Sequence, residues 1–343
     1  MMPPGPSRRI TSRDVAARAG VSQATVSLVF SGAPPSRVGP ATRERVLAAA
    51  RALGYEPNVV ARALVQGRSY TVGLVMPALR DPFFIDAATG AQRVLREQGY
   101  AVILAEADES SADRTVAMLR GRQIDGLMID AMGISSMAPE SLEGLAVVLI
   151  DEPSSRWPGV VSDAQEAGRL VARHLVDLGH RRIGFLGPLT DAHAFRLRER
   201  GFAGVLRAEG ILPRSEHVCR VPATVNGGRD GMRTLLTDAA APTAVFCAND
   251  LVALGALKAC AQAKRRVPND VSIVGCDDIE SAQLVTPELT TVAIRPRELG
   301  ARAAKLLLDV IEGRPHRARP KPLDVELIVR GTTARPPARG KRA

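Results

Sequence analysis

Most of this chain alternates between two patterns of hydrophobic and polar residues. Short runs rich in valine, leucine and isoleucine are each followed by a stretch with helical periodicity. The runs are TVGLVM, AVILAE, GLMID, VVLID, IGFLG, AVFCAND, SIVGCDD and TTVAI, and all of them lie beyond residue 70. Alternating strands and helices predict parallel sheets with helices on both faces. The repeats are numerous enough for two such sheets, so we predict a core of two doubly wound α/β lobes.

Residues 10–56 follow a helical pattern without strands. In the segment DVAARAGVSQATVSLVF, Gly20 separates two short helices that Thr11 and Ser22 are suited to cap, with Asp14 in the first turn. A third helix is predicted from Pro40 onward. The apolar faces of the three helices are Val15, Ala16 and Ala19, then Val26 and Val29, then Val46, Ala49, Ala50 and Leu53. This is a helix-turn-helix pattern, which places its second helix in the DNA major groove; on this stretch alone an ordinary αα-hairpin is an equal alternative.

A short helical pattern, VVARAL, lies between this module and the core. It is too short to be a stable helix by itself, so we predict an element that folds only when something holds it.

Charge is distributed unevenly along the chain. All but five of the 46 basic residues are arginine, and residues 1–68 hold ten arginines against three acids, a local net charge of +7 out of a total of +10. Such asymmetry is expected of a module that faces a polyanion. The cysteines show no metal-ligand spacing, no apolar run approaches a membrane span and no secretory signal is visible, so we expect a cytoplasmic protein without metal or other cofactor.

Polar side chains follow almost every predicted strand of the core. Ligands of open parallel sheets bind beyond the carboxyl ends of the strands, so these residues are candidates for a binding cleft. They are Asp81 with Phe83 and Phe84, then Asp130, Asp151, Asp163, Asn249, Asp250, Asp277 and Asp278, together with Arg198 and, less strongly, Arg196 on a following helix. Carboxylates, an amide and a guanidinium between aromatic walls suit a small polyhydroxylated ligand.

Several of these residues have a simpler interpretation. Asp163, Asp250 and Asp278 are suited to cap the helices that follow them, and we favour that role for all three. One of the two phenylalanines is expected in the core, and Arg198 could be a solvated ion-pairing residue. Trp157 is expected to line the cleft rather than to cap a loop.

The order of motifs resembles the lactose/galactose repressor (LacI/GalR) family of bacterial transcription regulators from residue 10 to about residue 333. The motifs are DVAARAGVSQATVSLVF, TRERV, GYEPNVVARAL, VGLVMP, DPFF, VVLIDEP, DLGHRRIGFLGP, RERGF, ANDLVALGALKA, VGCDD and LTTV. The resemblance implies a DNA-binding headpiece, a hinge helix that inserts a leucine into the minor groove, and a core similar to periplasmic sugar-binding proteins that closes on an effector. It also implies a repressor.

The resemblance assigns residues to both functions. Gln23, Ala24 and Leu28 would read the major groove, and Leu64 would be the minor-groove wedge. The DNA-binding residues it implies are Thr11, Ser22, Gln23, Ala24, Thr25, Ser27, Leu28, Asn58, Ala61, Arg62 and Leu64. The effector-binding residues it implies are Asp81, Phe83, Phe84, Asp151, Arg198, Asn249 and Asp277.

The sequence also departs from the family pattern. Leu28 stands where a guanine-reading arginine is frequent, Ser31 replaces a usual asparagine, and the loop over residues 32–39 is longer by about two residues. Ile294 replaces a polar cleft residue, and the basic end of the chain carries no leucine heptads, which favours a homodimer. Operator sequence and effector therefore cannot be copied from well-known members.

These observations predict six segments. Residues 1–9 are expected to be disordered, 10–56 to form the helix-turn-helix domain, 57–69 the hinge and linker, 70–334 the two-lobed core and 335–343 a disordered basic tail. Lobe 1 is expected over about 70–164 and 296–323, and lobe 2 over about 165–293 and 324–334.

Among functions, we expect a sequence-specific DNA-binding regulator of palindromic operators whose affinity is controlled by a small polar effector. A sugar is favoured because carboxylates dominate the cleft, and a nucleobase or nucleoside corepressor is the alternative. A solute-binding protein would not need the basic headpiece. An enzyme is disfavoured, since the chain lacks GxGxxG after the first core strand, GxxxxGK[ST] and GxSxG.

Overall fold

The computed structural model describes residues 10–30, 36–55, 67–108, 110–130, 137–212, 214–238, 240–315 and 321–337. The chain divides into two compact units, residues 1–70 and 71–343. The first unit contains α1 (Ser12–Ala19), α2 (Gln23–Phe30) and α3 (Pro40–Leu53). The predicted hinge residues Asn58, Ala61, Arg62 and Leu64 lie outside the described residues, as do Ser31 and the expected disordered segments except residues 335–337.

The ends of the headpiece helices follow the sequence signals. Thr11 and Asp14 form a reciprocal capping box at the start of α1, and Gly20, at φ 64°, ends this helix in the left-handed conformation that glycine adopts without strain. Pro40 opens α3, and Gly54 ends it in the same left-handed way.

A small apolar core joins these three helices. Its buried members are Val15, Ala16, Ala19, Val26, Val29, Val38, Val46, Ala49 and Ala50, which include every apolar-face residue predicted above except the half-buried Leu53. The ring of Phe30 meets that of Tyr55 edge-on, with centroids 5.6 Å apart. Two eight-residue helices are therefore held by side-chain packing, because isolated helices of this length are unstable in water.

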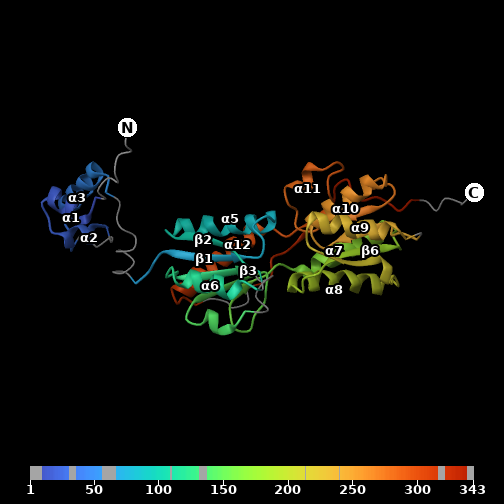
Figure 1. Ribbon diagram of the computed structural model, residues 1–343, viewed down its shortest axis with the longest axis horizontal. Coiled ribbons are helices and arrows are strands. Elements are labelled where there is room, and N and C mark those ends of the chain that lie inside the picture. The colour runs from blue at the N-terminus through green and yellow to red at the C-terminus, as the bar shows by residue number, and fades with distance from the viewer. Residues whose placement is uncertain are drawn as a thin grey trace, which may run out of the picture. The chain divides into compact units, whose positions relative to one another are not determined.

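Lobe 1 of the core is a parallel sheet in the order β2-β1-β3-β4-β5. Its strands are β1 (Thr71–Met76), β2 (Ala101–Glu106), β3 (Gly126–Asp130), β4 (Ala146–Ile150) and β5 (Gly159–Val160). One face is covered by α5 (Pro82–Glu97) and α12 (Pro296–Ile311), and the other by α6 (Ala112–Arg120), with η2 (Pro139–Leu142) beside it (Figure 1).

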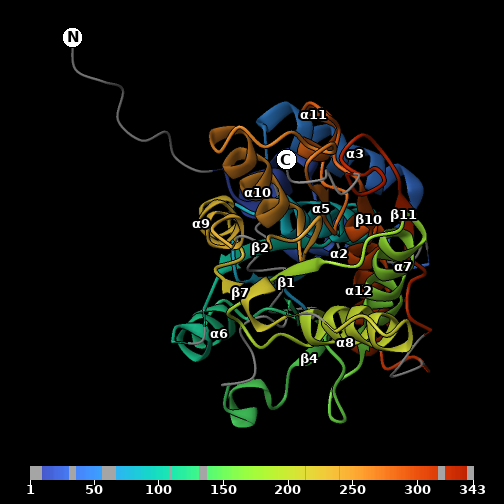
Figure 2. The ribbon, with the colours of Figure 1, turned by 90° about the vertical axis from the view of Figure 1, so that its right-hand side faces the viewer.

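Lobe 2 is a parallel sheet in the order β7-β6-β8-β9. Its elements are β6 (Ile183–Pro188), β7 (Val218–Val221), β8 (Ala244–Cys247) and β9 (Ser272–Val274), with α7 (Ala164–Asp177), α8 (His193–Ala208), η3 (Ser215–His217), α9 (Val225–Leu236), α10 (Asp250–Gln262) and α11 (Ser281–Leu284). The α7–α8 pair and the α9–α10 pair lie on opposite sides of this sheet (Figure 2).

The chain passes between the lobes near residues 162, 295 and 324. Ser162 forms a parallel bridge with Leu323, and Asp163 N donates to the Leu323 carbonyl at 2.9 Å. The segment TTVAI contains β10 (Thr291–Ala293), which pairs with β11 (Glu326–Ile328). This pairing is antiparallel, whereas the single bridges from Thr290 to Val274 and from Ala293 to Asp277 are parallel. TTVAI therefore lies parallel to the SIVGCDD run, as predicted, but it is not a full strand of the parallel sheet and its ladder partner is β11.

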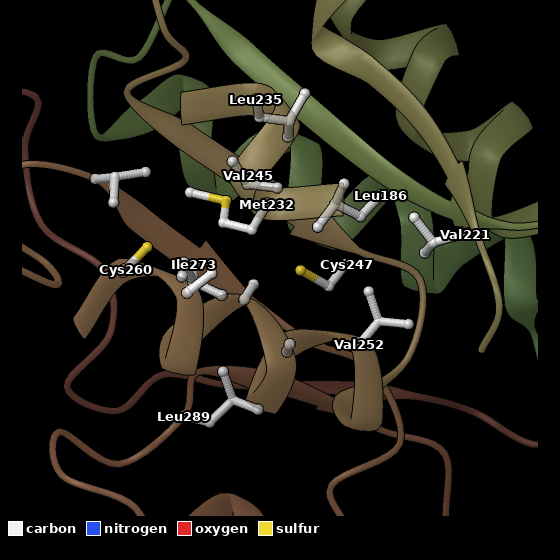
Figure 3. Close-up of a cluster of buried hydrophobic side chains, with 14 of the residues drawn as sticks. Leu186, Val221, Met232, Leu235, Val245, Cys247, Val252, Cys260, Ile273 and Leu289 are labelled. Carbon is white, nitrogen blue, oxygen red and sulfur yellow. The ribbon is translucent and has the colours of Figure 1, made fainter. Parts of the chain in front are cut away.

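A compact apolar cluster fills the face of lobe 2 under α9 and α10 (Figure 3). It contains Leu186, Met232, Val245, Ile273 and Leu289, all at 0% exposure. The buried thiols of Cys247 and Cys260 belong to the same cluster, and burial raises the pKa of Cys260 to about 12. These cysteines therefore act as small apolar side chains.

Several elements of lobe 2 were not predicted from the sequence, among them β7 and α9. The strand β7 has the sequence VCRV, which is short and interrupted by an arginine, and α9 carries three glycines in VNGGRDGMRTLL. Both signals are weak in sequence because glycine disfavours a helix. Here the glycines are needed, since a Cβ at Gly228 would collide with the backbone of Val252 on α10.

Close contact between α7 and α8 likewise depends on glycine. A Cβ added to Gly168 would collide with the backbone carbonyl of Arg198, and one added to Gly201 would collide with that of Gln165. The two helices thus cross at backbone contact distance beside Arg198, which places this residue relative to the sheet.

We predict that Gly201→Ala lowers the free energy of unfolding by about 1–3 kcal/mol, because α8 must move away from α7. The matched control is Gly204→Ala on the same helix, where the added methyl meets nothing within 4 Å. This control should raise stability by about 0.5–1 kcal/mol, the usual gain of alanine over glycine in a helix. Urea unfolding of both variants checks the prediction, and equal effects would contradict the proposed backbone contact.

A buried histidine of lobe 2 forms a hydrogen bond to the chain segment around residue 334. His180 is fully buried, its Nε2 lies 2.8 Å from the Ala334 carbonyl and its Nδ1 lies 2.9 Å from the Thr243 hydroxyl. A carbonyl only accepts hydrogen bonds, so Nε2 carries the proton. In the neutral ring Nδ1 is an acceptor, and it shares the Thr243 hydroxyl with the Arg182 carbonyl, which lies 3.2 Å from that oxygen. Burial lowers the pKa of His180 below its ordinary value of 6.5.

We predict that stability depends on this histidine below about pH 6.5. A lowered folded-state pKa means that the stabilising contribution is present above the unfolded pKa and is lost as pH falls through the folded pKa. Relative to His180→Gln, the wild type should lose up to about 1.4 kcal/mol more per pH unit in that range. Urea unfolding from pH 8 to pH 5 measures this difference, and parallel curves for the two proteins would contradict it.

Candidate functional site

A cavity of about 510 Å³ lies between the two lobes of the core. All seven predicted effector residues, Asp81, Phe83, Phe84, Asp151, Arg198, Asn249 and Asp277, line it. It is also lined by Arg80, Asp130, Glu152, Phe195, Thr224, Asn226 and several apolar residues. The structure thus brings together residues from the ends of β1, β3 and β4 in lobe 1 and from the second lobe's helices and loops.

Arg198 is the central cation of this cleft. It projects from α8, is 3% exposed, and donates from Nη1 to the Ala248 carbonyl at 2.8 Å. Its Nη2 lies 3.1 Å from Oδ1 of Asp277, and its guanidinium lies 5.3 Å from the ring centroid of Phe195. The alternative of a solvated surface arginine is therefore excluded.

Burial and charge act in opposite directions on this ion pair. Burial alone lowers the pKa of Arg198, but nearby carboxylates, Asp277 and Asp151 among them, outweigh it and the net pKa is raised. Burial raises the pKa of Asp277 well above its ordinary value, and Arg198 opposes that rise. Nε of Arg198 and Oδ1 of Asp277 are both buried without a hydrogen-bond partner. The lining therefore contains a buried donor and a buried acceptor that make no hydrogen bond, although Oδ1 lies within ion-pair distance of Arg198 Nη2.

Two further carboxylates are held by the strand ends of lobe 1. Asp81 is the N-cap of α5 and accepts from Phe83 N at 3.0 Å, and burial raises its pKa. Asp151 accepts from the backbone N–H and the hydroxyl of Ser162 at 2.9 and 2.8 Å, and its φ of 55° is unusual for a non-glycine residue. Such sparsely populated backbone conformations are found where a fold holds a functional group in place.

Negative charge exceeds positive charge in the cleft. Among the described residues that line it, five carry a carboxyl group and two a guanidinium. The carboxyl groups belong to Asp81, Asp130, Asp151, Glu152 and Asp277, and the guanidinium groups to Arg80 and Arg198. An anionic ligand would therefore meet repulsion as well as one buried cation.

The polar residues after β8 and β9 have separate roles. Asn249 is the N-cap of α10, accepting from Val252 N at 3.0 Å, and it also lines the cleft. The predicted capping role of Asp250 was wrong: its buried carboxylate accepts from the Thr291 hydroxyl at 2.5 Å and from Ile279 N at 3.0 Å, and burial raises its pKa to about 6.

Of the other two residues predicted to cap a helix, one does so and one does not. Asp163 caps α7 by accepting from Glu166 N at 2.9 Å, as predicted. The capping role predicted for Asp278 was wrong, because Asp278 pairs with Arg330 at 2.6 Å instead. Adjacent polar residues at a strand end are interchangeable in sequence, and packing decides between them.

The aromatic walls are Phe83, Phe84 and Phe195, each less than 10% exposed. Trp157 does not line the cavity, so its prediction was wrong: it packs against the apolar core of lobe 1, with the guanidinium of Arg156 5.1 Å from its ring. Ile294 is fully buried and is not among the lining residues.

Sequence reasoning missed five polar or aromatic lining residues. Arg80 and Glu152 follow the ends of β1 and β4, so the strand-end rule could have found them. Thr224 and Asn226 follow β7, which was not predicted. Phe195 gave no signal, because its place one turn before Arg198 resembles an ordinary core position.

The headpiece presents the predicted recognition residues on α2. Gln23, Ala24 and Ser27 are exposed and Leu28 is half-buried. The Ser22 hydroxyl caps the helix start by accepting from Thr25 N at 3.1 Å, while Thr11 is occupied in the capping box of α1. The side chain of Gln23 contacts Ser12 and Arg13 of α1.

Both the headpiece and the core match families of known proteins. A family model described as bacterial regulatory proteins, lacI family, matches residues 11–58, and one described as periplasmic binding protein-like domain matches residues 172–333. The HTH-type transcriptional repressor CytR of Escherichia coli (strain K12) is 34% identical over 332 residues, which cover 94% of this chain and 96% of that protein. The chain belongs to the LacI family.

Solved structures of LacI-family proteins have the same architecture. The lac repressor dimer bound to operator and the anti-inducer ONPF matches with a TM-score of 0.85 at 29% identity, covering 95% of this chain and 100% of that one. A complex of the transcriptional regulator CelR with cellobiose matches with a TM-score of 0.72 at 32% identity, covering 94% and 100%. The predicted family and fold class, a helical headpiece followed by two parallel-sheet lobes, are confirmed.

Family membership establishes the general activity. The chain is a DNA-binding transcriptional repressor with an effector-binding domain, and it is not an enzyme. Within the described residues, no helix is long and apolar enough to span a membrane, and no cluster of three or more histidine, cysteine or carboxylate side chains could hold a metal ion.

Proposed function

We propose that this repressor responds to an uncharged polyhydroxylated effector, a sugar or sugar derivative, bound in the interlobe cleft. The observation that carries the proposal is that Arg198 Nε and Asp277 Oδ1 are both buried in the cleft lining without a hydrogen-bond partner, although Oδ1 lies within ion-pair distance of Arg198 Nη2. A hydroxyl group can accept from an N–H donor and donate to a carboxylate oxygen, whereas a purely anionic group can only accept. The cellobiose bound by CelR, a protein of the same architecture, supports this choice of ligand class.

The charged groups of the cleft restrict the chemical class of the ligand further. The carboxyl oxygens of Asp81 and Asp151 can accept from hydroxyl donors, and the excess of carboxyl groups disfavours phosphorylated sugars and sugar acids. The second candidate is a nucleobase or nucleoside, which the three phenylalanine rings of the lining would favour through stacking.

For the DNA side, we propose that a homodimer binds a near-palindromic operator in the cytoplasm. One headpiece offers a single short recognition helix, and a two-fold dimer joins two such half-sites. The solved lac repressor is a dimer on its operator. In this proposal Thr11, Ser22, Thr25 and Ser27 contact the backbone, Gln23, Ala24 and Leu28 face the bases, and Asn58, Ala61, Arg62 and Leu64 act at the minor groove.

The proposed hinge accounts for the weak helical pattern that the sequence shows over residues 59–64. Two such helices would fold against each other in a widened minor groove, with Leu64 of each partly unstacking a base step. A ligand that changes the relative position of the lobes shifts this folding equilibrium, and operator affinity changes with it.

We predict that Arg198→Lys abolishes the effector response and leaves operator binding intact. Lysine keeps the positive charge that neighbouring carboxylates require but lacks the Nε donor, so the domain should fold while effector affinity falls at least about 10-fold. The matched control is Arg196→Lys on the same helix, whose side chain is 47% exposed and pairs with Asp191.

The measurement combines thermal unfolding with a panel of sugars, sugar phosphates and nucleosides and operator binding by fluorescence anisotropy. Neutral sugars should raise the Tm of wild type and of the control but not of Arg198→Lys, since a ligand stabilises only the state that binds it. A shift caused by nucleosides alone would favour the second candidate. A normal response of Arg198→Lys would show that the cleft assignment is wrong.

A further inference from the structure

The exposed face of α2 offers the bases no cation. The helix has the sequence QATVSLVF, without a charged residue, and Leu28 stands where an arginine is frequent in the family. Arginine bonded through two N–H groups to O6 and N7 is the commonest specific contact to guanine. If this repressor reads guanine in that way, the guanidinium must come from outside the recognition helix.

Arg13 of α1 lies beside the first residue of α2. It is exposed, and its Nε donates to Oε1 of Gln23 at 3.4 Å. Gln23 in turn donates from Nε2 to the Ser12 hydroxyl at 2.9 Å. The Nε of Arg13 can only donate, so it faces the amide oxygen of Gln23, and the amide NH₂ then donates to the Ser12 hydroxyl.

This arrangement engages the Nε of the Arg13 guanidinium and leaves its two Nη groups available for DNA. Within the described headpiece Arg13 has no ion-pair partner, and its two Nη groups have no hydrogen-bond acceptor. The other arginines of the unit are placed differently: Arg43, for example, donates to the Val29 carbonyl at 3.4 Å, and Arg18 lies in the last turn of α1. Arg13 alone among the described headpiece arginines contacts a predicted base-reading side chain.

We propose that Arg13 reads a guanine in each half-site through its two Nη groups, while Nε remains bonded to Gln23. Gln23 then acts as a positioning residue for Arg13, with Ser12 holding its amide. An arginine held by a third group presents its planar fork in one orientation, which is what bidentate recognition needs. The inference rests on the DNA binding of the family and is independent of the effector's identity.

The test uses the full-length protein and selection of bound duplexes from random DNA, followed by affinity measurements at several salt concentrations. Wild type should select a guanine at one position of each half-site. Arg13→Ala should lose about 5- to 150-fold of the preference for guanine over other bases there, with preferences elsewhere unchanged. Arg18→Ala removes an equal charge from the exposed side of the same helix, and it should leave every base preference unchanged.

Two further variants separate reading from simple charge. Arg13→Lys keeps the charge but not the fork, so it should lose the guanine preference and keep the salt dependence of wild type. Gln23→Ala should weaken the guanine preference in wild type and have no further effect at that position in the Arg13→Ala background, because it acts through Arg13.

Two results would overturn the proposal. One is a uniform loss of affinity in Arg13→Ala across all sequences with a shallower salt dependence, which is the signature of a phosphate contact. The other is an unchanged base preference in this variant. Failure of wild type to select any motif would count against sequence-specific operator binding itself and would thus be distinguishable from both.

Discussion

The buried guanidinium of Arg198 is the constraint on which the effector domain depends. Removing a charge from water is costly, and a buried ion remains only where fixed partners replace the lost hydration. Here the Ala248 carbonyl and Asp277 supply part of that replacement, and Asp151 adds charge from the other lobe. The replacement is incomplete, since Nε and Oδ1 make no hydrogen bond. A ligand that supplies the missing hydrogen bonds would stabilise such a cleft further.

Glycine residues at two helix crossings make this arrangement of the cleft possible. Gly168 and Gly201 let α7 and α8 touch through their backbones, and the contact falls on the carbonyl of Arg198 itself. Gly90 and Gly300 do the same for α5 and α12 in lobe 1, and α5 is the helix that Asp81 caps. The two sides of the cleft are therefore each fixed by a helix pair at minimal separation, where small changes of packing are resisted strongly.

Much of the site could be predicted from the sequence because parallel strands end at one edge of a sheet. Asp81, Asp151 and Asp277 were found by that rule, and family resemblance added the significance of Arg198. The rule failed where the strand itself gave little signal, as for β7 and the residues Thr224 and Asn226 that follow it. The rule also could not assign roles to adjacent acceptors such as Asn249 and Asp250. In the structure Gly275 and Thr291 pack against Asp250, so Asp250 points inward and Asn249 caps α10. Trp157 shows the same limit, since an aromatic residue near a cleft packs equally well against the adjoining core.

The headpiece and the effector cleft are rich in side chains of opposite charge. The headpiece concentrates arginine, which supplies attraction to any duplex, and the recognition helix itself is uncharged. Sequence reading and general attraction are therefore carried by different residues, so that a change in one leaves the other largely intact. The cleft instead concentrates carboxylates around one buried cation, an environment that disfavours nucleic-acid phosphate and phosphorylated metabolites alike. A strongly basic chain can thus hold a site rich in carboxyl groups, because each charge acts mainly on its own surroundings at physiological salt.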